Sequence, residues 1–200
     1  MKEELRALQN DRESYKKVLY RYLIIFSIGI NIIGVQLVSI LNFPAFLNTV
    51  GTILAGVLMG PFMGALVGLL TSIILGFLVD PGYFYFTFVN ILVGFIAGYI
   101  FKEHPFNIKT VLGASIFISI LTAIVGNTIS YMALGGVAGD QIDKITQILI
   151  EKGFNVFLAV NITGFFANLL DKILSFLLVF IVIVILDKKL EMPDFQIRWK

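Results

Sequence analysis

Polar side chains recur inside the apolar stretches of this 200-residue sequence, and their spacing gathers them on a few helix faces. Asn127 and Tyr131 are four residues apart, which puts both on one face of a helix. Four residues of the last apolar stretch repeat at three- or four-residue intervals: Asn161, Phe165, Asn168 and Lys172. Amides, a carboxylate and aromatic rings at one level predict a pocket with apolar walls and a few placed polar groups.

Ten residues make up the predicted substrate site. They share a polar or aromatic side chain and a position near the outer end of an apolar stretch: Asn48, Asp80, Tyr85, Asn90, Asn127, Tyr131, Asn161, Phe165, Asn168 and Asp171. Such a set fits a small, planar, partly polar ligand such as a pyrimidine, pyridine, flavin or thiazole better than a polyanion. The alternative for each amide is a hydrogen bond to a neighbouring helix, worth ~0.6 kcal/mol on average.

The adjacent charges of Asp171 and Lys172 need a separate account, because charged groups are costly inside a membrane. Neighbouring residues on a helix point about 100° apart. We therefore expect the two side chains not to face each other, with one turned inward and the other toward the headgroups. Counted back from Asp187 at ~1.5 Å per residue, Asp171 is roughly 24 Å from the inner boundary. This places it in the outer leaflet, near the polar rim.

Several kinds of chemistry are missing from the sequence. It contains no cysteine and one histidine, His104, so thiolate metal sites and imidazole catalysis are not expected. It also contains no phosphate-binding loop, dinucleotide fingerprint or metal-binding cluster. We predict no enzyme activity, no catalytic or metal-ligating residues, no cofactor and no nucleic-acid partner. Any transport by this chain must take its energy from a partner protein.

The composition fixes the environment in which these residues must be held. The chain is 58% hydrophobic and 14% charged, with a mean hydropathy of +0.94. Apolar stretches close to the ~20 residues that span a bilayer recur along it. The predicted fold class is therefore an all-α integral membrane protein with the lipid bilayer as its surroundings.

Six transmembrane helices are predicted, at residues 19–41, 52–60, 63–79, 86–101, 111–134 and 156–186. The last stretch is long enough for a tilted helix or for a span preceded by a re-entrant turn. Between the fifth and sixth spans, Ile142, Ile145, Ile148 and Leu149 repeat at helical spacing. This pattern predicts an amphipathic surface helix with one apolar face.

Residues 48–80 organise the predicted bundle. Gly56, Gly60, Gly64 and Gly68 recur every four residues, which lets another backbone approach closely in lipid. Pro61 breaks the run at its centre, so two apolar segments are expected in place of one straight helix. The segment is interpreted as a tight helical hairpin.

Lysine and arginine positions predict the orientation. Six lie at or before residue 21, two lie in residues 102–109 and four follow residue 186, whereas Lys144 and Lys152 lie on the other side. The positive-inside rule therefore puts both termini in the cytoplasm. The expected organisation is a cytoplasmic tail (1–18), a membrane domain (19–190) and a cytoplasmic C-terminal tail (191–200) of a multi-pass plasma-membrane protein.

Two stretches carry a family resemblance: LNTVGTILAGVLMGPFMGALVG, within the hairpin, and ANLLDKILSFLLVFIVI, near the end. They resemble the substrate-binding S components of energy-coupling factor (ECF) transporters, and the resemblance covers residues 19–190. It implies a six-helix bundle with an outward-facing vitamin pocket closed by residues 42–49. It also implies a transmembrane coupling subunit and two ATPase subunits as partners. The first span lacks the Ala-x-x-x-Ala docking pair that is frequent in that family.

Two other functions are compatible with the sequence. A membrane-embedded sensing or anchoring module would work with a separate signalling partner, because no signalling domain follows residue 190 in this sequence. An intramembrane enzyme would have to rely on Asp80 and Asp171. Co-purification with an ATPase would distinguish the transport subunit from both.

Overall fold

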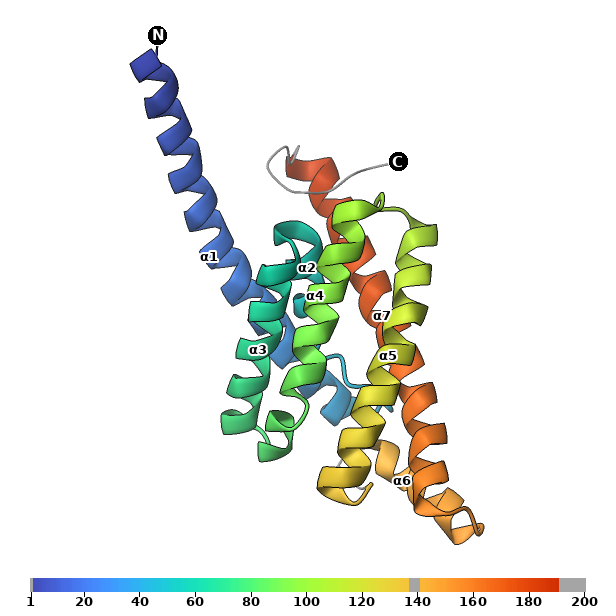
Figure 1. Cartoon of the computed structure of the whole chain (residues 1–200). Helices are drawn as coiled ribbons and strands as arrows, with labels where there is room; N and C mark the ends of the chain where they lie inside the picture. Colours follow the sequence, from blue (N-terminus) through green and yellow to red (C-terminus); the bar gives the residue numbers. More distant parts are fainter. Residues whose placement is uncertain (1, 137–140, 191–200) are drawn as a thin grey trace.

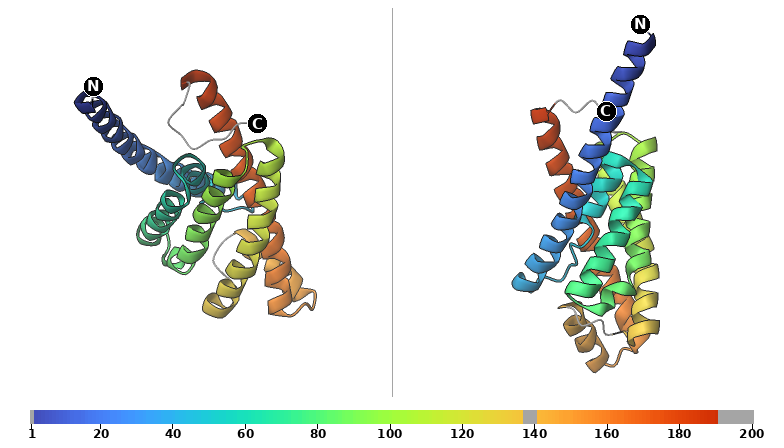
Figure 2. Two further views of the ribbon diagram at one scale, coloured as in Figure 1. Left: turned by 45° about the horizontal axis from the view of Figure 1, so that its top comes forward. Right: turned by 90° about the vertical axis from the view of Figure 1, so that its left-hand side faces the viewer.

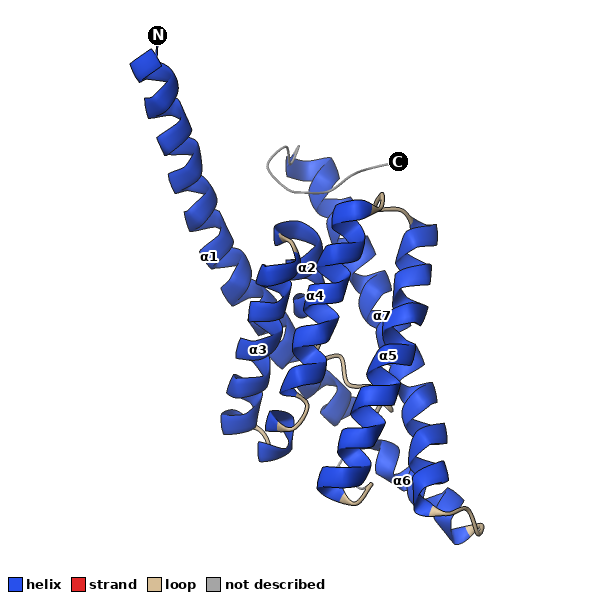
Figure 3. Cartoon of the chain, viewed as in Figure 1, coloured by secondary structure: helices blue, strands red, loops and turns tan. Residues whose placement is uncertain are grey.

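The computed structural model describes residues 2–136 and 141–190, and that part of the chain is helical throughout except for short connections (Figure 3). Seven α-helices and one 3-10 helix follow in order: α1 (Lys2–Leu41), α2 (Val50–Met59), α3 (Pro61–Leu78), η1 (Pro81–Phe84), α4 (Thr87–Glu103), α5 (Ile108–Leu134), α6 (Gln141–Glu151) and α7 (Val156–Leu190). The all-helical class is confirmed. The predicted C-terminal tail, 191–200, lies outside the described residues.

Four helices are long and apolar enough to cross a membrane: Ser14–Leu41 of α1, α3, α5 and Val156–Leu186 of α7. α2 is a shorter apolar helix of 10 residues. The count of six spans and the orientation of the termini stay predictions. α1 continues without a break from the tail into the first span. α7 is one helix, which agrees with the first of the two alternatives given for residues 156–186.

The helix break inside the glycine-rich segment is confirmed. α2 ends at Met59 and α3 begins at Pro61, with Gly60 between them at φ 92°. This left-handed backbone suits glycine, which has no Cβ to clash. Proline at the first position of α3 loses nothing, because the first N–H groups of a helix have no partner within it.

Helices α2, α3 and α4 (Thr87–Glu103) contact one another at glycines. The sequence predicted the contact of α2 with α3 but not the participation of α4. A Cβ added to Gly64 of α3 would lie 2.7 Å from the Cα of Gly56 on α2. A Cβ added to Gly56 would lie 2.6 Å from the carbonyl oxygen of Gly94 on α4. The four-residue glycine repeat is therefore divided between α2 and α3, which face each other and α4. Gly94 and Gly98 complete the contact from the α4 side.

The helices form two groups that stand side by side (Figure 1). α1 to α4 make the first group and α5 to α7 the second, in which α5 packs along α7 and α6 packs on α7. α2 is central: all its residues are buried, and it contacts α1, α3, α4 and α7. Figure 2 shows α1 extending past the bundle at the end where α7 also finishes.

Aromatic rings join the two groups in the half of the molecule nearer the end of α7. Phe101, at the end of α4, lies 5.2 Å from Phe106 and 6.2 Å from Phe176 of α7, measured between ring centroids. Phe106 in turn stacks on Phe180 at 5.5 Å. This contact fills the space between α4 and α7 at that end, so open space between the groups is left to the opposite half.

Candidate substrate-binding site

A cavity of about 310 Å³ lies between the two helix groups. Its walls come from α1, from residues 42–49 (the α1–α2 connection), from residues 79–86 (the α3–α4 connection), and from α4, α5, α6 and α7. The α3–α4 connection and α6 lie at the end of the molecule away from the first turns of α1 and the last turns of α7 (Figure 1). The N-terminus of α2 reaches the cavity from within the bundle through Thr49.

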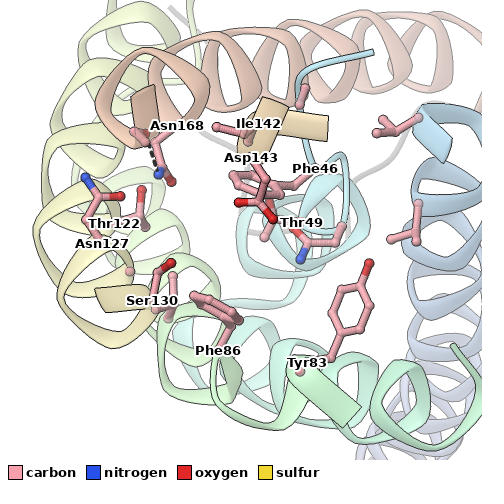
Figure 4. Close-up of a pocket in the computed structure, with 18 of the residues that line it drawn as sticks. Phe46, Thr49, Tyr83, Phe86, Thr122, Asn127, Ser130, Ile142, Asp143 and Asn168 are labelled. Carbon is pink, nitrogen blue, oxygen red and sulfur yellow. Dashed lines mark hydrogen bonds between the residues drawn. The ribbon is translucent and has the colours of Figure 1, made fainter. Parts of the chain in front are cut away.

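Side chains from opposite walls surround one space (Figure 4). Asn127 and Thr122 of α5 lie beside Asn168 of α7 on one side of this space. The rings of Tyr83 and Phe86, from the α3–α4 connection, form another side. The lining combines apolar and aromatic surfaces with separate amide and hydroxyl groups, as is typical of small-molecule sites.

Half of the predicted site residues line this cavity. They are Asn48, Asp80, Asn90, Asn127 and Asn168. They belong to two connections and to α4, α5 and α7, so residues far apart in the sequence meet here. The Asn168 amide nitrogen donates to the Gly164 carbonyl at 2.8 Å, and the Asn127 amide nitrogen donates to the Asn161 carbonyl at 3.4 Å.

The other five predicted residues do not line the cavity: Tyr85, Tyr131, Asn161, Phe165 and Asp171. Tyr85 is exposed. Tyr131 packs edge-to-face on Phe157 at 5.3 Å. Asn161 and Phe165 line a separate hollow between α5 and α7. Their periodicity placed each on a face of its own helix, but neighbouring helices determine which face meets the cavity.

Asp171 and Lys172 correct the expectation that they would not face each other. Both are buried, and the Lys172 ammonium pairs with Asp171 Oδ2 at 2.5 Å. The flexible lysine stem turns the ammonium back to the neighbouring carboxylate, which the Cα directions alone do not reveal. Asp171 is 0% exposed, so its carboxylate is enclosed by the protein.

Asp171 also holds the α1–α2 connection. Its Oδ1 accepts hydrogen bonds from the backbone N–H groups of Phe46, at 3.1 Å, and Leu47, at 2.7 Å. Leu47 has φ 44°, a left-handed conformation that is unfavourable for a residue with a Cβ. The carboxylate compensates for this strain, and the connection supplies Ala45, Phe46 and Asn48 to the cavity wall.

A buried polar network fixes Asn90. The Asn31 amide nitrogen on α1 donates to the hydroxyls of Thr52 on α2 and Thr71 on α3, both at 2.9 Å. Thr52 donates to Asn90 Oδ1 at 3.3 Å, and Asn90 donates to Ser72 at 3.1 Å. Since both ends of the Asn90 amide are used, its orientation at the cavity is set by three other helices.

Sequence reasoning missed several lining residues. Thr122, Gly126 and Ser130 of α5 share the cavity wall and follow a four-residue spacing that could have identified them. Thr146 of α6 is buried, and its hydroxyl lies 2.7 Å from that of Thr163 on α7. α6 is therefore part of the wall, where the sequence had indicated a surface helix.

Comparison with known proteins identifies the family. A scan against protein-family models matches residues 21–183 to the ECF transporter substrate-specific component, over well more than half of the chain. The chain belongs to this family. Its members are substrate-binding subunits of transporters and not enzymes, which confirms both the resemblance and the expectation of no enzyme activity. No curated protein and no solved structure matches the chain significantly.

Membership in the ECF family identifies the environment of the chain and the kind of partners it has. It is a multi-pass membrane protein and a substrate-binding component. The family implies association with a transmembrane coupling subunit and ATPases, and a small-molecule substrate. No energy-providing motif was expected in this sequence, which agrees with a subunit that depends on such partners.

Proposed function

We propose that this ECF substrate-specific component captures a small water-soluble vitamin or vitamin precursor outside the plasma membrane. It delivers the ligand together with a transmembrane coupling subunit and two ATPases. The observation that carries this proposal is the cavity of about 310 Å³ between the two helix groups, lined by residues of both. Its walls combine aromatic rings with amides, which suits a small, partly polar ligand.

The proposed ligand contacts are Asn48, Asp80, Asn90, Asn127 and Asn168, all of which line the cavity. Aromatic contacts come from Tyr83 and Phe86 on the α3–α4 connection. The positions of Tyr85, Tyr131, Asn161, Phe165 and Asp171 give no support for direct contact. The α1–α2 connection is the proposed cover on one side, held by Asp171.

Co-purification tests the proposal. The tagged chain, expressed in its native cell and extracted in mild detergent, should bring down one membrane coupling protein and two ATPase subunits. Native mass spectrometry of the purified chain should show a bound molecule of vitamin-like mass that is released on unfolding. Recovery of a signalling protein in place of the ATPases would support the sensing module and contradict the proposed transport role.

A further inference from the structure

Lys172 is a buried cation on the wall of the cavity. Its side chain is 3% exposed, and the residue lines the cavity from α7. A lysine ammonium has three N–H donors. Among the residues that the structure describes, two acceptors contact it: Asp171 Oδ2 at 2.5 Å and the Thr49 hydroxyl at 3.2 Å. One donor is therefore left for an acceptor inside the cavity.

A helix end adds to the positive potential at the same place. Thr49 is the N-cap residue of α2, lines the cavity and touches the Lys172 ammonium. The N-terminus of a helix carries a partial positive charge from its aligned peptide dipoles. Lysine and helix end together make this part of the wall a donor-rich surface, suited to a ligand oxygen or ring nitrogen.

The remaining charges on the wall disfavour an anionic ligand. Asp80 lines the cavity with an acidic side chain, and Asp171 already pairs with Lys172. A ligand carboxylate or phosphate at Lys172 would have to compete with Asp171. It would also place a second negative charge beside one cation, and two like charges that share a cation repel each other strongly in a low dielectric. A neutral carbonyl brings no such charge.

We infer that Lys172 is the specificity-determining residue of the cavity. It donates a hydrogen bond to a carbonyl or equivalent neutral acceptor of the substrate, so the substrate class is a neutral or cationic carbonyl-bearing heterocycle. Asp171 is a positioning residue, because it holds the ammonium without lining the cavity. This inference rests on the proposed function, since it names the ligand chemistry of the same site.

Two matched probes test it on the full chain in nanodiscs. 3,4-Dihydroquinolin-2(1H)-one, a lactam, and 1,2,3,4-tetrahydroquinoline share one bicyclic skeleton and one N–H, and differ in a single carbonyl group. By titration calorimetry the lactam should bind at least about tenfold more tightly, the effect expected of a hydrogen bond to a charged donor. A third probe, quinoline-4-carboxylate, should bind more weakly than the lactam because it is an anion.

The variant Asp171→Asn/Lys172→Met removes the ammonium without leaving an unpaired carboxylate. The amide oxygen that it introduces still accepts from Phe46 and Leu47, so folding should survive. The single variant Lys172→Met serves as a second test. In both, the preference for the lactam over 1,2,3,4-tetrahydroquinoline should fall below about threefold.

Four outcomes would overturn the inference: equal binding of the lactam and tetrahydroquinoline to the unaltered chain, a preference that persists in both variants, tightest binding of the carboxylate, or no binding of the lactam. None of these outcomes bears on the proposed capture of a substrate. That proposal is tested by co-purification of the ATPases and by detection of a retained molecule. If the co-purification and the mass spectrometry succeed but the probe comparison fails, the proposed transport function is still supported and the proposed role of Lys172 is wrong.

Discussion

At the residue scale, Asp171 shows how a charge is accommodated in the interior of an apolar bundle. Burying an isolated carboxylate is prohibitive, so it must be paired and hydrogen-bonded. Asp171 has both kinds of partner, since one oxygen pairs with Lys172 and the other accepts two backbone N–H groups. The pair thereby fastens the α1–α2 connection to α7, two segments more than a hundred residues apart.

Removing the charge of Asp171 alone should be strongly destabilising. Asp171→Asn keeps an acceptor for Phe46 and Leu47 but leaves the Lys172 ammonium buried without a counter-ion. Breaking a buried ion pair in this way costs ~3–5 kcal/mol. We expect this loss in the unfolding free energy measured by denaturant titration in detergent.

The double variant Asp171→Asn/Lys172→Met provides the control for that measurement. Because it removes both charges, its loss of unfolding free energy should be clearly smaller than that of Asp171→Asn. If the single and double variants were equally destabilised, the cost would come from packing and not from the unpaired charge.

The amides of Asn127 and Asn161 offer a matched comparison within one pair of helices. Asn127 lines the cavity, whereas Asn161 bonds to its own helix at Phe157, 2.8 Å away. Asn127→Ala should weaken binding of the retained molecule by ~1–3 kcal/mol, the cost of leaving a buried polar ligand group unpaired. Competition binding on the purified protein measures this affinity. Asn161→Ala should leave it unchanged, and equal losses in both variants would contradict the position of the cavity.

Single side chains were predictable from the sequence only in part. Residue type and depth found Asn48, Asp80, Asn90, Asn127 and Asn168, because amides and carboxylates are rare in apolar helices and need partners. The same criteria also gave Asn161 and Tyr131, which the structure puts away from the cavity. Periodicity defines a face of one helix, but it contains no information on which neighbour covers that face.

At the element scale, the contact of α2, α3 and α4 depends on the absence of side chains. Glycine costs roughly 1 kcal/mol relative to alanine within a helix. Close packing offsets this cost here, because the three backbones approach more closely at Gly56, Gly64 and Gly94 than a Cβ atom would allow. Close backbone approach is a main source of helix association in lipid, where hydrophobic burial gives little.

Adding one methyl group should therefore have opposite effects at two helical glycines. Gly64→Ala would place its Cβ against the backbone of Gly56 and Gly94, so overpacking should destabilise by ~1–3 kcal/mol. Gly113 of α5 is exposed and has nothing within 4 Å of an added Cβ. Gly113→Ala should be neutral or stabilising, and thermal unfolding in detergent compares the two. Equal stability of both variants would remove the close-contact argument.

Helix boundaries followed from local chemistry, whereas helix partners did not. The Gly60–Pro61 break was foreseen because both residues interrupt a helix for reasons contained in the residues themselves. Asn107 caps α5 by accepting from the Thr110 N–H at 3.0 Å, so the helix begins three residues before the predicted span of 111–134. Gly94 and Gly98 of α4 complete the contact. The glycine spacing in the hairpin did not predict them, because a spacing pattern contains no information about which helix packs against it.

At the scale of the whole molecule, the two helix groups separate stability from binding. Aromatic packing of Phe101, Phe106, Phe176 and Phe180 fills one half of the boundary between them. The other half contains the cavity. The all-helical membrane class followed from composition alone. The two-group arrangement did not, because it depends on long-range contacts between α2 and α7 and between α4 and α5.

The predicted orientation can be tested with single cysteines, since the chain has none of its own. Lys152→Cys, in the connection between α6 and α7, should react with an impermeant maleimide on intact cells. His104→Cys, in the connection between α4 and α5, should react only after the cells are permeabilised. Both residues are exposed, so access depends on the side of the membrane. The reverse pattern would turn the cavity toward the cytoplasm.

The shortness of α2 has a consequence for the length of the transport path. Its ten residues span only about 15 Å, roughly half of the ~30 Å hydrocarbon thickness of a bilayer. Thr49, at its first end, contacts the cavity, and Gly60, at its second end, begins the return of the chain through α3. Under the proposed function and the predicted orientation, a ligand seated against Thr49 would therefore wait about one short helix length from the far end of α2. The distance left for the partner subunits to open would be about half of the bilayer.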